Sequence, residues 1–207
     1  MKYTTQDLMT IYDTIEIKSR EEANAMHDKL KELDIEPTDN MNSPLNEAHI
    51  VIKDYSISAR YYNLENNKVS LDIFITDTPD APFKERSWTK LCECAFDIRT
   101  GKALTKKLVA NTHGNNKKIY DVLEHDQTCE KILVIVCTVI MFMAYYKIDA
   151  TATHNISKTD KKALERKYKY NHKIPLTTKR YAINRDSHGT HVITCPAWEV
   201  RGYYRHY

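Results

Sequence analysis

Residues 49–76 read HIVIKDYSISARYYNLENNKVSLDIFIT, and this stretch decides the fold class. Apolar and polar side chains alternate over residues 49–62, with a change of phase near Asp54 that indicates a β-bulge. The alternation returns over residues 68–76, after an Asn-rich turn at residues 63–67. Two alternating runs joined by a short polar turn predict an antiparallel hairpin.

The flanking sequence predicts further strands and helices around this hairpin. Strands are predicted over residues 8–18, 88–98, 103–110, 177–183 and 191–207. Helices are predicted over residues 20–33, 119–146 and 158–169. Ser19 and Glu22 match a capping box at the start of the first helix. This order predicts an α+β fold, in which an antiparallel β-meander is covered by helices and a basic C-terminal helix-plus-strands segment follows.

The run at residues 132–146 is almost entirely apolar. As a helix it would span about 22 Å, less than the roughly 30 Å of a bilayer's hydrocarbon core. We therefore expect a buried core helix and no membrane association. The first residues carry no apolar leader, and the five cysteines are an odd number. Both observations predict reduced thiols and a cytoplasmic protein.

Charge divides the chain into two parts. Residues 147–207 carry 13 Lys and Arg against 5 Asp and Glu, whereas residues 1–146 carry 18 against 23. The basic part also holds five of the nine His and six of the 14 Tyr. We expect residues 1–146 to form an acidic α+β scaffold. Residues 147–207 then form a basic Tyr- and His-rich segment, either packed on that scaffold or forming a small subdomain.

Cations interleaved with aromatic rings are typical of surfaces that bind a phosphate backbone and stack on unpaired bases. RNA or a ribonucleoprotein is the expected partner, and a host protein with an acidic surface is the alternative. The alternative is that these residues bind nothing: the cations form a solvated surface and the tyrosines pack on the sheet. The predicted nucleic-acid contacts are Lys161, Lys162, Arg166, Lys167, Lys169, Arg180, Arg185, Arg201, Tyr203, Tyr204 and Arg205.

A catalytic alternative rests on Arg185, His188 and His191, which offer a cation, a general acid and a general base. A small metal-independent ribonuclease needs these three roles. A basic loop with solvated histidines explains the same residues without catalysis. No phosphate-binding loop, metalloprotease motif or nucleophile elbow is present, and the chain has only four Gly. We expect no catalysis, no cofactor and no small-molecule substrate.

A metal alternative rests on His188, His191 and Cys195, which have the spacing H-x2-H-x3-C. Structural zinc takes four such ligands, so a fourth His or Cys would come from elsewhere in the chain. The result would be a zinc-stapled protein-interaction module. The alternative is that these residues bind no metal. They then form a turn that leads into a strand, with exposed histidines and a buried cysteine.

Two further expectations concern the predicted strands. Cys92 and Cys94 lie two residues apart, so both belong to one face, which we expect to be core. Asp72 and Glu93 alternate with the apolar positions of their strands, so we expect solvent to surround them.

Residues 197–207 read AWEVRGYYRHY. This segment resembles a V-R-G-H-W-R sequence near the C-terminus of small, mostly uncharacterised phage-encoded proteins. Val200, Arg201, Gly202 and Arg205 match it, with two tyrosines in place of its His and Trp. The resemblance implies a phage-type accessory protein that acts in the host cytoplasm. Such proteins commonly inhibit host machinery, so it also implies a candidate inhibitor of a host defence such as CRISPR–Cas.

Overall fold

The computed structural model describes residues 2–34, 43–65, 68–98, 100, 103–108, 128–146, 148–168 and 174–183. Its strands are β1 (Lys2–Thr4), β2 (Thr14–Ile17), β3 (Ala48–Ile52), β4 (Ile57–Glu65), β5 (Lys68–Thr76), β6 (Ser87–Asp97), β7 (Ala103–Leu108), β8 (Ile148–Asn155) and β9 (Thr177–Ile183). Its helices are α1 (Thr5–Ile11), α2 (Arg20–Glu32), α4 (Thr128–Tyr145) and α5 (Lys158–Tyr168), with a 3-10 turn η1 (Phe83–Glu85).

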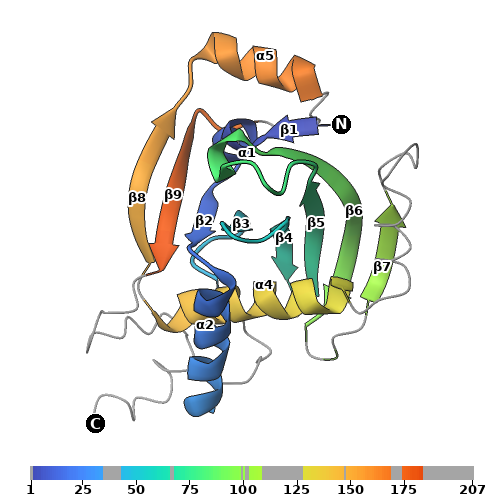
Figure 1. Ribbon diagram of the computed structural model, residues 1–207, viewed down its shortest axis with the longest axis vertical. Coiled ribbons are helices and arrows are strands. Elements are labelled where there is room, and N and C mark those ends of the chain that lie inside the picture. Colours follow the sequence, from blue (N-terminus) through green and yellow to red (C-terminus); the bar gives the residue numbers. More distant parts are fainter. Residues whose placement is uncertain are drawn as a thin grey trace.

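All nine strands form one sheet in the order β1-β6-β5-β4-β3-β2-β9-β8, with β7 also paired to β6 (Figure 1). Strands β3 to β7 follow one another as an antiparallel meander. The predicted α+β class and its meander are therefore confirmed. The parallel pairings of β2 with β3 and β9 were not predicted. The pairing of β2 with β3 is parallel because α2 connects the two strands in a β-α-β crossover.

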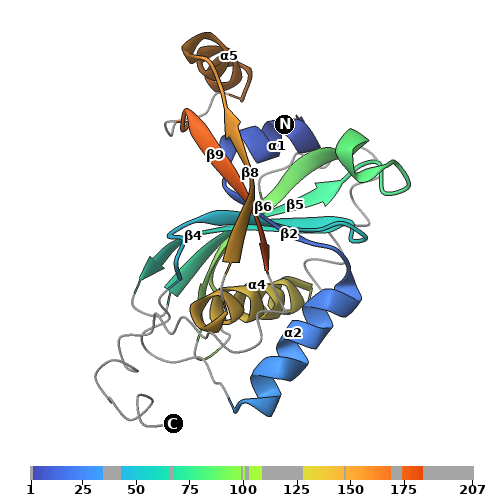
Figure 2. The same cartoon turned by 90° about the vertical axis from the view of Figure 1, so that its left-hand side faces the viewer.

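Helices cover both faces of the sheet (Figure 2). On one face α2 and α4 pack over the larger apolar core. On the other, α1 and α5 pack over a smaller core that includes Tyr3, Leu8, Trp88 and Tyr168. The apolar run predicted as a core helix is α4, and most of its described side chains are buried. Within the described ranges, no helix is long and apolar enough to cross a membrane.

The strand predicted over residues 8–18 is wrong in its first half, which is helix α1. Thr4 caps this helix: its Oγ1 accepts the Asp7 backbone N–H at 3.0 Å, and Asp7 Oδ2 accepts the Thr4 N–H at 3.3 Å. This reciprocal capping box satisfies two backbone donors and selects the helix. The second half is β2, as predicted.

The single bulged strand predicted over residues 49–62 is also wrong, because the chain reverses between β3 and β4. The two strands pair antiparallel, with Ala48 opposite Tyr61. The phase change near Asp54 therefore marks a turn. Asp54 accepts the Arg20 N–H through its carboxylate at 3.0 Å, which ties that turn to the start of α2.

The other predicted elements in the described ranges are confirmed to within a few residues. They are the β4–β5 hairpin, β6, β7, β9, α2, α4 and α5. Ser19 caps α2 by accepting the Glu22 N–H at 3.2 Å, while the Glu22 carboxylate accepts the Lys18 N–H. Strands β1 and β8 were not predicted. The start of the predicted helix 119–146 and the strand 191–207 lie outside the described residues.

Candidate nucleic-acid interface

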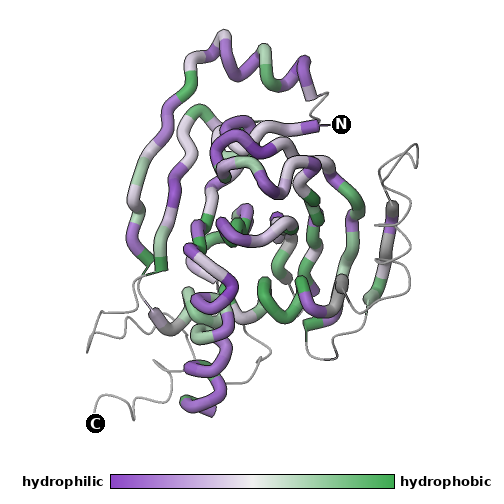
Figure 3. Tube along the Cα trace, viewed as in Figure 1, coloured by the Kyte–Doolittle hydropathy of each residue, from purple (hydrophilic) through white to green (hydrophobic). Residues whose placement is uncertain are grey.

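The described part of the basic segment is β8, α5 and β9. Ser157 starts α5 as predicted, since its Oγ accepts the Asp160 N–H at 3.0 Å. Strand β9 continues the sheet beside β2, and β8 pairs with β9. Figure 2 shows α5 on the side of the sheet opposite α2 and α4. Figure 3 shows that most residues along α5 are hydrophilic.

Tyr168 anchors the last turn of α5. Its ring stacks on Tyr3 with 4.4 Å between centroids, and its hydroxyl donates to Asp7 Oδ2. Lys167 Nζ donates to the same oxygen at 2.9 Å. Burial acts to raise the pKa of Asp7, but hydrogen bonds from Tyr168, Lys167 and Thr4 outweigh it and lower that pKa. One carboxylate of α1 therefore fixes α5 in place.

Three cations lie along the outer face of α5: Lys158, Lys162 and Arg166. All three are exposed, and their four-residue spacing places them in one row on the helix. None of them forms an ion pair with any residue that the structure describes. Like charges at this spacing repel one another, so the row carries an electrostatic cost that a bound polyanion would remove.

The other predicted contacts in the described ranges are engaged by carboxylates. Lys161 Nζ lies 3.8 Å from Glu165, and Arg180 Nε lies 3.9 Å from Glu16. Lys167 is held by Asp7, as described above. The structure thus brings Lys162 and Arg166 together on one open row and places these three cations elsewhere.

The remaining candidate residues lie outside the described part of the chain. They are Lys169, Arg185, His188, His191, Cys195, Arg201, Tyr203, Tyr204 and Arg205. The ribonuclease and zinc alternatives therefore stay predictions. Among the residues that the structure does describe, no group of three or more His, Cys, Asp or Glu side chains could hold a metal ion.

A cleft of about 430 Å³ separates α5 from α1 and the end of β8. Gln6 and Thr10 of α1 line one wall, and Leu164 and Lys167 of α5 line the other. His154 of β8 also lines the cleft. The cleft lies on the side of α5 away from the cation row, so it does not extend the row.

The sheet face beneath α1 holds a buried ionic cluster that the sequence patterns did not predict. The Arg60 guanidinium lies between the rings of Tyr12 and Tyr62, 4.6 and 4.5 Å from their centroids. It also pairs with Asp72 at 3.0 Å and with the Glu47 carboxylate. Burial, with the charge of Asp72, raises the pKa of Tyr62 to about 12.

Asp72 is 2% exposed, so its expected solvent exposure was wrong. Its carboxylate also lies 2.9 Å from Lys90 Nζ, which reaches Glu93 at 2.7 Å. Burial acts to lower the pKa of Lys90, but Asp72 and Glu93 outweigh it and raise that pKa. The hairpin register places Arg60 directly opposite Asp72, and this cross-strand pair is the signal that could have revealed the cluster.

His49 lies beside this cluster and is 1% exposed. Its Nε2 is 2.9 Å from Ser58 Oγ, and Nδ1 has no hydrogen-bond partner among the described residues. Burial, with the charge of Arg60, lowers the pKa of His49 to about 3. The ring is therefore neutral at ordinary pH and serves as part of the core.

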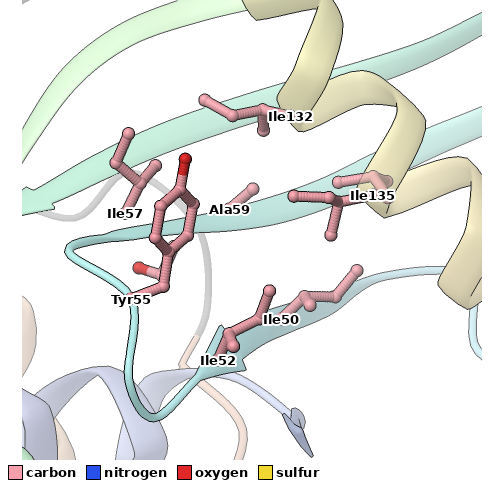
Figure 4. Close-up of a pocket in the computed structure, with 9 residues that line it drawn as sticks. Ile50, Ile52, Tyr55, Ile57, Ala59, Ile132 and Ile135 are labelled. Atoms are coloured by element: carbon pink, nitrogen blue, oxygen red, sulfur yellow. The ribbon is translucent and has the colours of Figure 1, made fainter. Parts of the chain in front are cut away.

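The face of the sheet opposite the ionic cluster is apolar, as predicted for the face that carries Cys92 and Cys94. Both thiols are buried there, with 3.7 Å between their sulfur atoms. A cavity of about 20 Å³ also lies on this face. In Figure 4, Ile50 and Ile57 face Ile135 of α4 around it. These features belong to packing and offer no chemistry for a ligand.

The chain was compared with family models, curated proteins and solved structures. No family model, curated protein or solved structure matches the chain. The function must therefore be argued from the chain's own residues.

Proposed function

We propose that the protein binds RNA or a ribonucleoprotein through α5 and the basic residues that follow it, without catalysis. The observation that carries the proposal is the open row of Lys158, Lys162 and Arg166. These cations keep their charge exposed, while nearby Lys167 and Arg180 are held by carboxylates. Phosphates spaced along a backbone are the natural counterions for such a row.

The anchoring of α5 supports this role. Because Tyr3, Tyr168 and Asp7 fix one end of the helix, the row is presented on a rigid element. Rigid presentation lowers the entropy lost when a partner binds. On this proposal the protein is a phage-type accessory protein in the host cytoplasm. It inhibits a nucleic-acid-handling host defence, such as CRISPR–Cas, by occupying its RNA or ribonucleoprotein.

The test is fluorescence anisotropy with a labelled single-stranded RNA over a series of salt concentrations. The variant Lys158→Gln/Lys162→Gln/Arg166→Gln should bind more weakly at low salt. Its plot of log K against log salt should flatten by roughly 0.7 for each phosphate that the variant no longer neutralises. Lys18→Gln/Lys31→Gln/Lys84→Gln, which removes three exposed cations elsewhere, is the matched control and should bind like the wild type.

Two results would remove the proposal. One is an absence of RNA binding even at the lowest salt concentration. The other is equal weakening by the row variant and the control variant, because binding would then follow net charge alone. A labelled RNA of unchanged length after incubation is the expected result for a protein without catalysis, and cleavage would favour the ribonuclease alternative.

A further inference from the structure

The two ends of the sheet are built differently. At one end β1 has three residues and β7 carries Lys106 and Lys107. Short strands and lysines are the usual means by which proteins prevent a sheet edge from pairing with another chain. At the other end β8 has eight residues, IDATATHN, with neither Lys, Arg nor Pro. Its central residues, Ala150 to Thr153, are all exposed.

Among the described strands, only β9 pairs with β8, so the other edge of β8 has no partner strand there. In Figure 1, β8 is the outermost strand, and α5 leads back across the molecule from its end, away from the free edge. The exposed side chains at the centre of β8 are alanines and threonines, which are small enough for a second backbone to approach.

The backbone groups that face outward follow from the pairing with β9. Ile156 donates its N–H to Leu176 O at 3.0 Å, so this residue faces β9. Residues of an antiparallel strand alternate in direction, hence His154 also faces β9. The N–H and C=O groups of Thr153 and Asn155 therefore point outward.

A bulge reverses this alternation in the middle of β8. The register with β9 shifts between Ala150 and Ala152, which makes Thr151 an extra residue. On the far side of the bulge, the outward-facing residues are therefore Ile148 and Ala150. The free edge offers backbone donors and acceptors at four positions, two on each side of Thr151.

We propose that β8 pairs antiparallel with β8 of a second copy of the chain, about a two-fold axis between Thr151 and Ala152. In this register Ile148 lies opposite Asn155 of the second copy, and Ala150 lies opposite its Thr153. All four outward-facing positions are then used, and each such pair exchanges two backbone hydrogen bonds. A register shifted by two residues in either direction leaves half of them without partners.

Side-chain hydrogen bonding supports the same register. It places Asp149 directly opposite His154 of the second copy, with both side chains on the α1 face of the sheet. A carboxylate can accept a hydrogen bond from an imidazole N–H, and polar side chains that face each other directly in this way stabilise strand pairs. The two-fold axis repeats this contact, so each dimer contains it twice.

The proposal is independent of RNA binding and is tested by sedimentation equilibrium of the full chain over a wide concentration range. The wild type should show a monomer–dimer equilibrium. Thr153→Pro removes an outward N–H for which the described residues of the monomer offer no acceptor, and proline is tolerated at such edge positions. This variant should be monomeric at every concentration, whereas Thr153→Val, which keeps the N–H, should still dimerise.

A charge exchange tests the register itself. His154→Glu places two carboxylates opposite one another twice, so it should weaken association by on the order of tenfold. The double variant Asp149→Lys/His154→Glu should recover wild-type association. Circular dichroism and thermal melts establish that each variant is folded. A wild type that stays monomeric, or dimers unaffected by Thr153→Pro, would overturn the proposal, and a double variant that fails to recover would overturn the register.

Discussion

The replacement Asp72→Asn tests whether the buried ionic cluster stabilises the fold through its charge. The carboxylate side chain is 3% exposed and lies between Arg60 Nη1 at 3.0 Å and Lys90 Nζ at 2.9 Å. Asparagine keeps the shape of the side chain but removes the negative charge. Two cations then remain largely buried, with side-chain exposures of 10% and 19%.

The expected loss in the free energy of unfolding depends on which carboxylate partners Arg60 and Lys90 keep. Breaking a buried ion pair by removing one partner costs about 3–5 kcal/mol. Here Arg60 keeps Glu47, and Lys90 keeps Glu93, although these two carboxylates are 56% and 39% exposed. Exposed ion pairs contribute at most about 1 kcal/mol, so the remaining partners compensate little. We expect Asp72→Asn to lower the free energy of unfolding by about 3 kcal/mol.

The assay is urea denaturation followed by circular dichroism, with Glu93→Gln as the matched control. The control removes one exposed carboxylate from the same network and should cost less than about 1 kcal/mol. Replacing the whole buried set, as Arg60→Met/Asp72→Leu/Lys90→Met, should cost less than Asp72→Asn, because no buried charge is left without a partner. Equal losses for Asp72→Asn and Glu93→Gln would refute the reasoning.

Four further expectations follow from the core and from the attachment of α5. His49 is neutral in the fold, with its pKa lowered to about 3, while in the unfolded chain it takes up a proton near pH 6.5. Its contribution to stability is therefore complete above about pH 6.5 and falls by at most about 5 kcal/mol as the pH drops towards 3. His49→Gln should flatten stability against pH over that window, and an unchanged slope would contradict the assignment. Asp7→Asn should cost about 1–3 kcal/mol and speed amide exchange in α5, because Tyr168 and Lys167 lose a charged acceptor. Exchange rates in α5 equal to those of the wild type would show that the helix is held by other contacts. Val136→Ile adds one methylene beside the cavity of about 20 Å³ and should raise the urea midpoint by the equivalent of about 0.5 kcal/mol, whereas a lower midpoint would mean that the cavity walls cannot accept it. Burial raises the pKa of the Cys137 thiol to about 12, so this thiol should react with alkylating reagents only after unfolding, as mass spectrometry of the native and denatured protein can show.

Sequence patterns predicted the elements whose apolar residues lie on one face. Strand β5 and helix α2 carry such faces, and both were found at nearly the expected bounds. Strand β8 was missed because it has no apolar face. It sits at the edge of the sheet, with solvent around most of its side chains, so burial left no pattern in its sequence.

The cluster around Asp72 was missed for a different reason. Alternation along β5 was interpreted as a sheet with one buried and one solvated face, which is common in antiparallel sheets. Here α1 folds back over the second face, and the adjoining Tyr12 covers Arg60. A polar side chain on that face is therefore buried and must find a charged partner. Local sequence carries no sign of which distant helix will cover a strand.

The cation row was predicted in part. Lys162 and Arg166 were recognised from composition and lie on the open face of α5. Lys167 and Arg180 were predicted on the same grounds but face carboxylates of α1 and β2. Their partners are far away along the chain, so no local pattern distinguishes an engaged cation from an available one.

The position of β2 constrains how the chain can fold. This early strand lies between β3, which follows it closely, and β9, which emerges some 160 residues later. During synthesis, one edge of β2 stays without its final partner until almost the whole described sheet has left the ribosome. Completing the sheet therefore requires a contact between distant parts of the chain. Such long loop closure slows folding and gives chaperones a period in which an unpaired internal strand is accessible.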